Sequence, residues 1–213
     1  MCFALSAASL YAFEPEQNNM NDPKAKSILD KVSLTFKNKE GIYSRFSQTI
    51  EVPGGKNTSK EGELYLKGNK FKVQFPDQTI FCDEKSVWTY LKEDNEVQIN
   101  DYEPDQSDIT PSSMFNIYQS DFHYIQIADE SISGTPCFVI DLTPKDKSRS
   151  YFKIRLWINK STFFARRIKV FDKNGYRYTY TINHIDTKSK LSDTLFQFNR
   201  ANFPGVKVED LRM

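Results

Sequence analysis

YFKIRLWIN, residues 151–159, is the stretch with the most regular alternation of side chains in the chain. One set of alternate positions is apolar: Phe152, Ile154, Leu156 and Ile158. The other set is mainly polar: Lys153, Arg155, Trp157 and Asn159. Because successive side chains of an extended chain point to opposite faces, this spacing predicts a strand with one apolar face. That face must be covered, so the stretch predicts a sheet that closes or packs against helices.

The same period of two recurs along most of the chain. Connections between the alternating segments are short, which favours sequential antiparallel pairing. Asn174 and Gly175 predict a hairpin turn, because both residues tolerate a positive φ. About eleven or twelve strands result, at 42–51, around 64–66, and at 70–75, 79–83, 86–92, 95–101, 122–128, 135–143, 151–159, 163–172, 176–186 and 195–199.

Two segments have a helical pattern instead. A capping Asp22 followed by Pro23 predicts the start of the first helix. Its apolar residues recur at spacings near 3.6, at Ile28, Leu29, Val32 and Phe36. Thr110 and Pro111 predict a second, shorter helix that ends at about Ser120. A strongly curved antiparallel sheet with helices over its mouth satisfies both patterns.

Composition limits the classes of function. The chain has 213 residues, which suits one domain, with 29 basic against 28 acidic residues. No basic stripe indicates nucleic-acid binding. The 17 Phe and 11 Tyr residues allow two interpretations. They fit a β-rich core, since aromatic residues favour strands, or an apolar cavity lined by rings.

The N-terminus predicts export. Residues 1–13 are apolar and uncharged but too short to span a bilayer, which takes about twenty residues. We interpret them as the remainder of a secretory signal, followed by a flexible polar segment at 14–21 and a single domain at 22–213. A disordered cytoplasmic leader is the alternative. Cys82 and Cys137 are expected to be buried free thiols, although an oxidising compartment would also allow a disulfide between them.

No motif indicates catalysis, a metal or a cofactor. His123 and His184 fall on separate strands without ligand spacing, and no nucleophile elbow or phosphate-binding loop is present. We therefore expect a binding protein rather than an enzyme. A filled core and a ligand cavity both explain the apolar faces. If a cavity is present, its candidate residues are Phe46, Leu64, Leu66, Phe71, Val73, Phe75, Ile80, Met114, Phe115 and Ile117.

Several short stretches occur in a characteristic order. The central ones are GELYLK at 62–67, FKV at 71–73 and CDEKSVWTY at 82–90. Others are FSQ at 46–48, LTPK at 142–145, FQF at 196–198, PGV at 204–206 and VED at 208–210. Over about residues 24–212 this order resembles the LolA family of periplasmic outer-membrane lipoprotein carriers. Lys67-Gly68 and Glu96-Val97 resemble its Bacteroidetes-type branch.

This resemblance implies a fold and a function. The implied fold is mainly β, an incomplete antiparallel barrel of eleven strands with a helical lid over a hydrophobic cavity. The implied function is to shuttle acylated lipoproteins, as a monomer in the periplasm, from an inner-membrane ABC transporter to the outer membrane, where the acceptor is left open. Family members hold the lid with an Arg that precedes a Pro. Lys67 stands at that place and becomes the candidate latch, although it lacks the planar fork of Arg.

Three other functions compete with this one. A carrier for another lipid would have the same fold. A lipid-sensing envelope regulator would bind a membrane-anchored partner tightly. A secreted hydrolase would turn over its substrate. Co-purifying lipid without turnover would distinguish the carriers from the other two.

Overall fold

The computed structural model describes residues 21–37, 39–103, 110–111 and 121–212. The first element is α1 (Pro23–Lys37), which begins at the predicted proline. The backbone N–H of Lys24 donates to Asp22 Oδ1 at 2.8 Å, so Asp22 caps the helix as predicted. Among the residues described, α1 is the one α-helix, and the second predicted helix lies at 112–120, outside them.

Thirteen strands form one large sheet, against the eleven that were expected. The strands are β1 (Ile42–Glu51), β2 (Thr58–Lys67), β3 (Lys70–Gln74), β4 (Gln78–Cys82), β5 (Ser86–Leu91), β6 (Glu96–Asp101), β7 (Phe122–Gln126), β8 (Glu130–Ile132), β9 (Thr135–Pro144), β10 (Tyr151–Asn159), β11 (Ala165–Asp172), β12 (Arg177–Asp186) and β13 (Lys207–Asp210). The short strands β8 and β13 were not predicted.

The prediction of a strand at 195–199 was wrong. Two short 3-10 helices, η3 (Asp193–Phe196) and η4 (Arg200–Asn202), surround that position. The side chains of Ser192 and Asn199 accept from the backbone N–H groups of Thr194 and Ala201. The segment therefore satisfies part of its backbone locally instead of pairing with a neighbouring strand.

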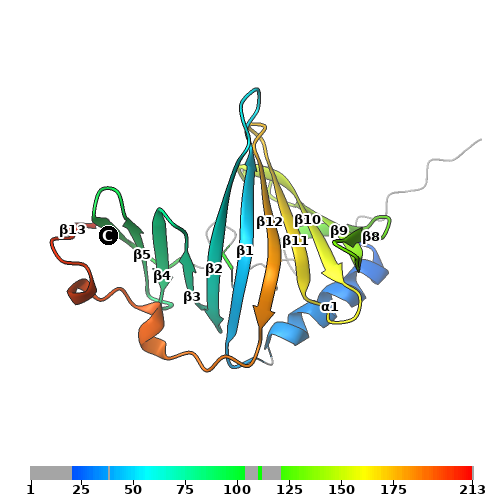
Figure 1. Ribbon diagram of the computed structural model, residues 1–213. Helices are drawn as coiled ribbons and strands as arrows, with labels where there is room; N and C mark the ends of the chain where they lie inside the picture. Colours follow the sequence, from blue (N-terminus) through cyan, green and yellow to red (C-terminus); the bar gives the residue numbers. More distant parts are fainter. Residues whose placement is uncertain (1–20, 38, 104–109, 112–120, 213) are drawn as a thin grey trace, which may run out of the picture.

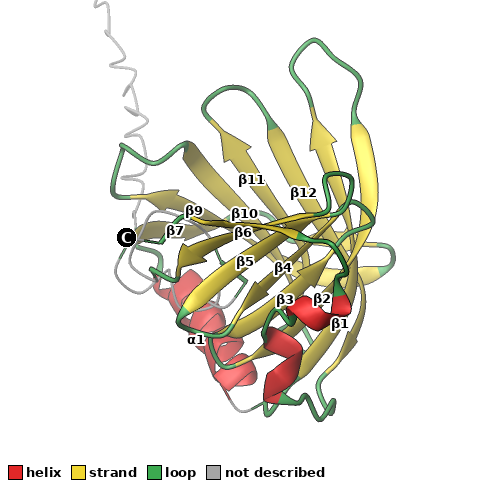
Figure 2. Ribbon diagram, turned by 90° about the vertical axis from the view of Figure 1, so that its left-hand side faces the viewer, coloured by secondary structure: helices red, strands yellow, loops and turns green. Residues whose placement is uncertain are grey.

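The sheet is open, with the order β13-β6-β5-β4-β3-β2-β1-β12-β11-β10-β9-β7, and β8 pairs with β9 off this path. Neighbouring strands are antiparallel, except that β13 runs parallel to β6. Figures 1 and 2 show the sheet bent like an arch, with β1 and β12 at its apex. The strands β3–β6 form one arm, and β9–β11 form the other. This mainly β, unclosed architecture confirms the coarse prediction.

A bulge changes the face of one residue in the stretch that predicted the sheet. The pairing of β10 with β11 shifts between Tyr151 and Lys153, which leaves Phe152 as the extra residue. Phe152 is therefore 42% exposed, and Tyr151 takes the inward position at 5%. The expectation that Phe152 shares a face with Ile154 was wrong, because a bulge reverses the alternation on one side of it.

α1 packs against the inner face of the β9–β11 arm (Figure 1). We call the resulting cluster the α1 core. It comprises Ala25, Ile28, Leu29, Val32, Phe122, Ile140, Leu142, Tyr151, Ile154, Leu156, Ile158, Ala165 and Ile168. Three residues of the predicted helical stripe, Ile28, Leu29 and Val32, are buried in it. The sequence pattern of α1 thus determines which face of the helix packs against the sheet.

A second cluster lies on the other arm and at the apex. We call it the cavity cluster, which comprises Ile42, Phe46, Leu66, Phe71, Val73 and Cys82. Cys82 here and Cys137 elsewhere are both buried free thiols, as expected. Burial raises the pKa of the Cys82 thiol to about 11.

The chain after β12 crosses the outer face of the β3–β6 arm. The Phe198 ring centroid lies 6.1 Å from that of Phe81, and the Phe203 centroid lies 4.4 Å from that of Tyr90. These contacts place aromatic rings over strands that would otherwise present apolar residues to water. Within the described residues, no helix is long and apolar enough to cross a membrane.

Candidate functional site

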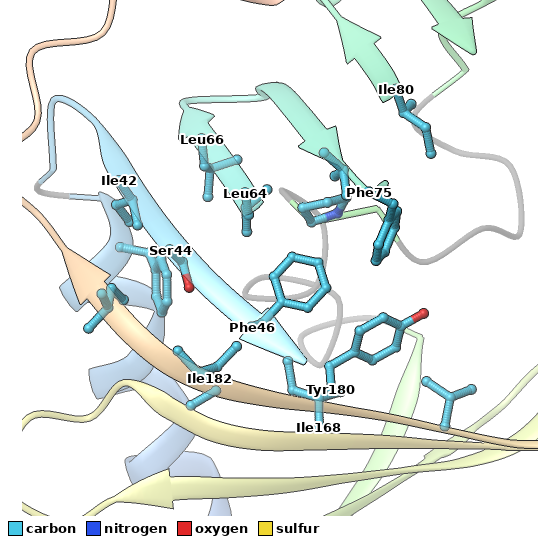
Figure 3. Close-up of a pocket in the computed structure, with 16 residues that line it drawn as sticks. Ile42, Ser44, Phe46, Leu64, Leu66, Phe75, Ile80, Ile168, Tyr180 and Ile182 are labelled. Carbon is cyan, nitrogen blue, oxygen red and sulfur yellow. The ribbon is translucent and has the colours of Figure 1, made fainter. Parts of the chain in front are cut away.

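A cavity of about 260 Å³ lies inside the arch. Residues from both arms and from the apex form its wall (Figure 3). The wall comprises Phe36, Ile42, Ser44, Phe46, Leu64, Leu66, Val73, Phe75, Ile80, Pro111, Ala165, Ile168, Val170, Tyr180, Ile182 and Ile185. All but Ser44 and Tyr180 are apolar. The site therefore suits a hydrophobic ligand. Its volume lies just below the range of about 300–1,000 Å³ that is common for small-molecule pockets.

Alternation along β1 supplies one part of the wall. Ile42, Ser44 and Phe46 point inward because they are two residues apart. On the neighbouring β12, Ile182 and Ile185 both line the cavity although they are three residues apart. The pairing of β1 with β12 shifts between Arg45 and Phe46, and this irregularity in β12 brings both isoleucines to the same face.

Gly62 on β2 allows two aromatic rings to meet at the wall. The rings of Phe46 and Phe75 are edge to face, with centroids 5.5 Å apart. A Cβ atom at position 62 would lie 2.6 Å from Phe46 Cζ and 2.8 Å from Phe75 Cε1. These distances are far below van der Waals contact, so a side chain here would push the rings out of place. Gly62, the first residue of the GELYLK stretch, therefore leaves the space in which these two rings pack.

The two polar wall residues have different hydrogen bonds. Ser44 Oγ donates to the backbone carbonyl of His184 at 2.9 Å, which satisfies its hydroxyl proton. Tyr180 instead accepts, since Gln48 Nε2 donates to its hydroxyl oxygen at 3.0 Å. Burial raises the pKa of Tyr180 above its ordinary value of 10.0, so the hydroxyl stays protonated at neutral pH. Figure 3 shows the Tyr180 ring beside that of Phe46.

Most of the predicted cavity residues lie at this cavity. Six of them line it: Phe46, Leu64, Leu66, Val73, Phe75 and Ile80. Phe71 does not line it; the side chain is 5% exposed and packs within the cavity cluster. Met114, Phe115 and Ile117 lie outside the described residues. Pro111, just before them, is part of the wall. A role of these residues in ligand binding stays a prediction.

Sequence reasoning missed the wall contributed by β11 and β12. Those residues are Ala165, Ile168, Val170, Tyr180, Ile182 and Ile185. The strands themselves were predicted, at 163–172 and 176–186, but none of their residues was assigned to the cavity. The missing information was the pairing of β12 with β1, strands that are separated by most of the chain.

Lys67, the candidate latch, contacts the segment that follows β12. Its Nζ atom donates to the carbonyl of Leu191 at 3.1 Å and to Asp193 Oδ1 at 2.9 Å. Lys70 Nζ lies 3.4 Å from the same carboxylate oxygen. The two lysines lower the pKa of Asp193 through these hydrogen bonds. Lys67 thus ties β2 to the C-terminal segment, and its role as a latch for residues 112–120 stays a prediction.

Residues with the chemistry of a metal site do not converge in the described part of the chain. No group of three or more His, Cys, Asp or Glu side chains there could hold a metal ion. His123 and His184 lie on different strands, β7 and β12. The apolar cavity is therefore the feature on which a functional assignment can be built.

Solved structures with a similar fold come from several bacteria. An uncharacterized conserved protein of Thermus thermophilus superposes with a TM-score of 0.59 at 14% identity, over 88% of this chain and 99% of that one. A LolA superfamily protein of Nitrosomonas europaea gives 0.45 at 17% identity, over 82% and 97%. A chain of the Pseudomonas aeruginosa MucA/MucB complex gives 0.42 at 13% identity, over 83% and 61%.

The sequence comparison gives the family. A search of curated proteins finds no match to this chain. The family described as outer membrane lipoprotein carrier protein LolA matches residues 37–199, which is more than half of the chain. That range extends from the end of α1 to the segment after η3 and contains nearly all of the cavity wall. With the predicted motifs, the open sheet and this match in agreement, the chain belongs to the LolA family of outer membrane lipoprotein carrier proteins.

Proposed function

We propose that this chain is a periplasmic carrier that holds the acyl chains of lipoproteins in its cavity and shuttles them from the inner to the outer membrane. The observation that carries the proposal is the apolar cavity inside an unclosed sheet. Membership of a family of carrier proteins supports binding rather than catalysis. Residues 1–13 as a secretory signal, 14–21 as a flexible segment and 22–213 as the carrier domain complete the proposal.

The physical task explains the wall. Each CH₂ group of an acyl chain gains about 0.8 kcal/mol when it leaves water, so a carrier must hide the chains to move them. Release requires that the site is not too tight. A cavity of about 260 Å³ is small for the anchor of a lipoprotein. We infer that loading widens it, because an open sheet allows its two arms to separate without breaking strand pairs.

The proposed partners follow from this route. An inner-membrane ABC transporter hands over the acylated lipoprotein, and the carrier, as a monomer, delivers it to an outer-membrane acceptor whose identity the proposal leaves open. A carrier for another lipid is the main competitor. Mass spectrometry of the lipids that co-purify from the periplasm separates the two, since a single non-protein lipid in place of lipoproteins would favour the competitor.

The direct test changes one wall residue. Ile80 lines the cavity from β4 and is partly exposed, so an Ile80→Asp variant can fold but places an unpaired charge against the ligand. We expect the affinity for a fluorescent triacylated lipopeptide to fall about tenfold or more, and a tenfold loss is about 1.4 kcal/mol. Competition with unlabelled lipopeptide measures it.

Thr79→Asp is the matched control, because Thr79 is the adjacent residue of β4 and points to the opposite face. It should bind the lipopeptide as the wild type does. Thermal unfolding of both variants establishes that they are folded. A folded Ile80→Asp protein with wild-type affinity would remove the cavity as the binding site.

A further inference from the structure

We propose, on the basis of the carrier function above, that Tyr180 recognises the carbonyl oxygen of an ester-linked or amide-linked acyl chain. Its hydroxyl would donate one hydrogen bond to that oxygen inside the cavity. Tyr180 would then be a specificity-determining residue, which selects acylated ligands over hydrocarbon chains of equal length.

The first argument is the unused proton of the hydroxyl. Gln48 Nε2 donates to the Tyr180 oxygen, so this bond uses a lone pair and leaves the O–H free to donate. Across the described part of the chain, no acceptor receives it. Ser44 differs, because its hydroxyl proton already goes to the carbonyl of His184. Tyr180 is therefore the wall hydroxyl that has a hydrogen bond to offer.

The second argument is that the hydroxyl is held in place. Gln48 and Tyr180 are directly opposed in the β1–β12 pairing, and Gln48 is only 8% exposed. The Tyr180 ring also packs beside Phe46, with centroids 6.0 Å apart. A donor that is oriented before binding loses little freedom when a ligand arrives. The hydroxyl is protonated, and so a donor, at neutral pH, and burial raises its pKa above 10.0.

The third argument is the direction of polarity along the cavity. Ile42 and Ile185 lie at one end of the β1 and β12 strands, and Gln48 and Tyr180 lie farther toward the opposite ends. On β2, which pairs with β1 on its other side, Lys60 lies directly opposite Gln48. Its Nζ atom lies 4.3 Å from the centroid of Phe75 and 2.9 Å from Asp77 Oδ2.

This gradient orients an amphiphilic ligand. The hydrocarbon tail fits among the isoleucines, the carbonyl group meets Tyr180, and the polar head faces Lys60. A ligand without a carbonyl oxygen at this position leaves the Tyr180 donor without a strong acceptor, which lowers its affinity. Sites that leave a buried polar group unpaired reject such analogues. Tyr180 thus gives an apolar cavity a chemical preference.

The experiment compares two probes with the same chain. They are 1-palmitoyl glycerol, which has an ester carbonyl, and 1-hexadecyl glycerol, in which a CH₂ group replaces that carbonyl and only the weaker ether oxygen remains beside it. We expect the wild-type protein to bind the ester about 3- to 10-fold more tightly, the range for one net hydrogen bond. Tyr180→Phe should lower the affinity for the ester to that for the ether, and leave the affinity for the ether unchanged.

Tyr178→Phe is the matched control. Tyr178 lies two residues away on the same face of β12 but is not part of the cavity wall. It should keep the preference for the ester. Equal loss of both probes in Tyr180→Phe, or an ester preference that survives the substitution, would overturn the inference. A wild-type protein that binds neither of the two probes nor the lipopeptide would instead refute the carrier function.

A second measurement does not require a stable variant. The infrared carbonyl band of the ester probe, ¹³C-labelled at that carbon, shifts to lower frequency when the oxygen accepts a hydrogen bond. We expect the shifted band in the wild-type complex. A band at the frequency of the ester in dry hydrocarbon solvent would overturn the inference.

Discussion

The α1 core and the cavity occupy two parts of one concave surface. Both are built from strands that alternate inward apolar and outward polar residues. On the β9–β11 arm, α1 inserts Ile28, Leu29 and Val32 and leaves a filled cluster. At the apex and on strands β3 and β4 of the β3–β6 arm, the inward residues surround a cavity of about 260 Å³. The strands are alike, and what covers them is different.

This difference teaches where binding sites arise in such a sheet. Apolar strand faces predict burial but not the partner that buries them. Ile168 illustrates the point, because it belongs to the α1 core and also lines the cavity. A single residue can therefore stabilise the fold on one side and contact a ligand on the other. Substitutions on either side of this boundary should separate stability from binding.

The largest effect is expected in the α1 core. Leu29→Ala removes a side chain that is 2% exposed, and a filled core cannot collapse fully around the gap. We expect a loss of about 2–5 kcal/mol in the free energy of unfolding, measured by urea denaturation. Ligand affinity of the folded fraction should not change. Leu34→Ala on the same helix is the control, since Leu34 is 59% exposed and should cost less than about 0.5 kcal/mol. Equal losses from both would mean that α1 does not fill the arm.

An intermediate effect is expected at the cavity wall. Gly62→Ala places a Cβ atom 2.6 Å from Phe46 Cζ, so the two rings must move. We expect a loss of about 1–3 kcal/mol, typical of overpacking, together with weaker lipopeptide binding. Thr58→Ala, an exposed position on the same strand, should change neither. Unchanged binding in Gly62→Ala would show that the Phe46–Phe75 pair does not shape the site.

The smallest effect is expected outside the concave surface, where Lys67 and Lys70 hold Asp193. Folding lowers the pKa of Asp193, so its ionised carboxylate stabilises the folded state. This stabilisation is complete above pH 3.8, the ordinary pKa, and is lost as the pH falls through the lowered pKa. Relative to the intrinsic exchange rate at each pH, amide exchange in η3 should therefore become faster in acid, and more so than exchange in α1. Asp193→Asn should show the faster η3 exchange already at neutral pH. The same η3 exchange in wild type and variant at neutral pH would contradict this. The effect should be small, because the Asp193 side chain is 59% exposed.

Local chemistry explains the features that could be predicted. The Asp22 cap, the stripe through Leu29 and the alternation in 42–51 depend on residues close together in the chain. The same holds for the inward positions of Leu64, Val73 and Ile80, which follow from alternation once their strands are known. These features therefore determined the mainly β fold, and the ordered motifs indicated the family and, with it, an unclosed sheet.

Only the tertiary structure decided the features that join distant segments. The pairing of β1 with β12 brought the residues of β11 and β12 to the cavity wall, and its irregularity brought Ile182 and Ile185 to one face. The bulge at Phe152, the parallel β13 and the contact of Lys67 with Asp193 arose in the same way. By itself, the sequence determined which side chains need cover. Which partner covers each of them, and where space is left, depends on pairings across the whole chain that no local pattern encodes.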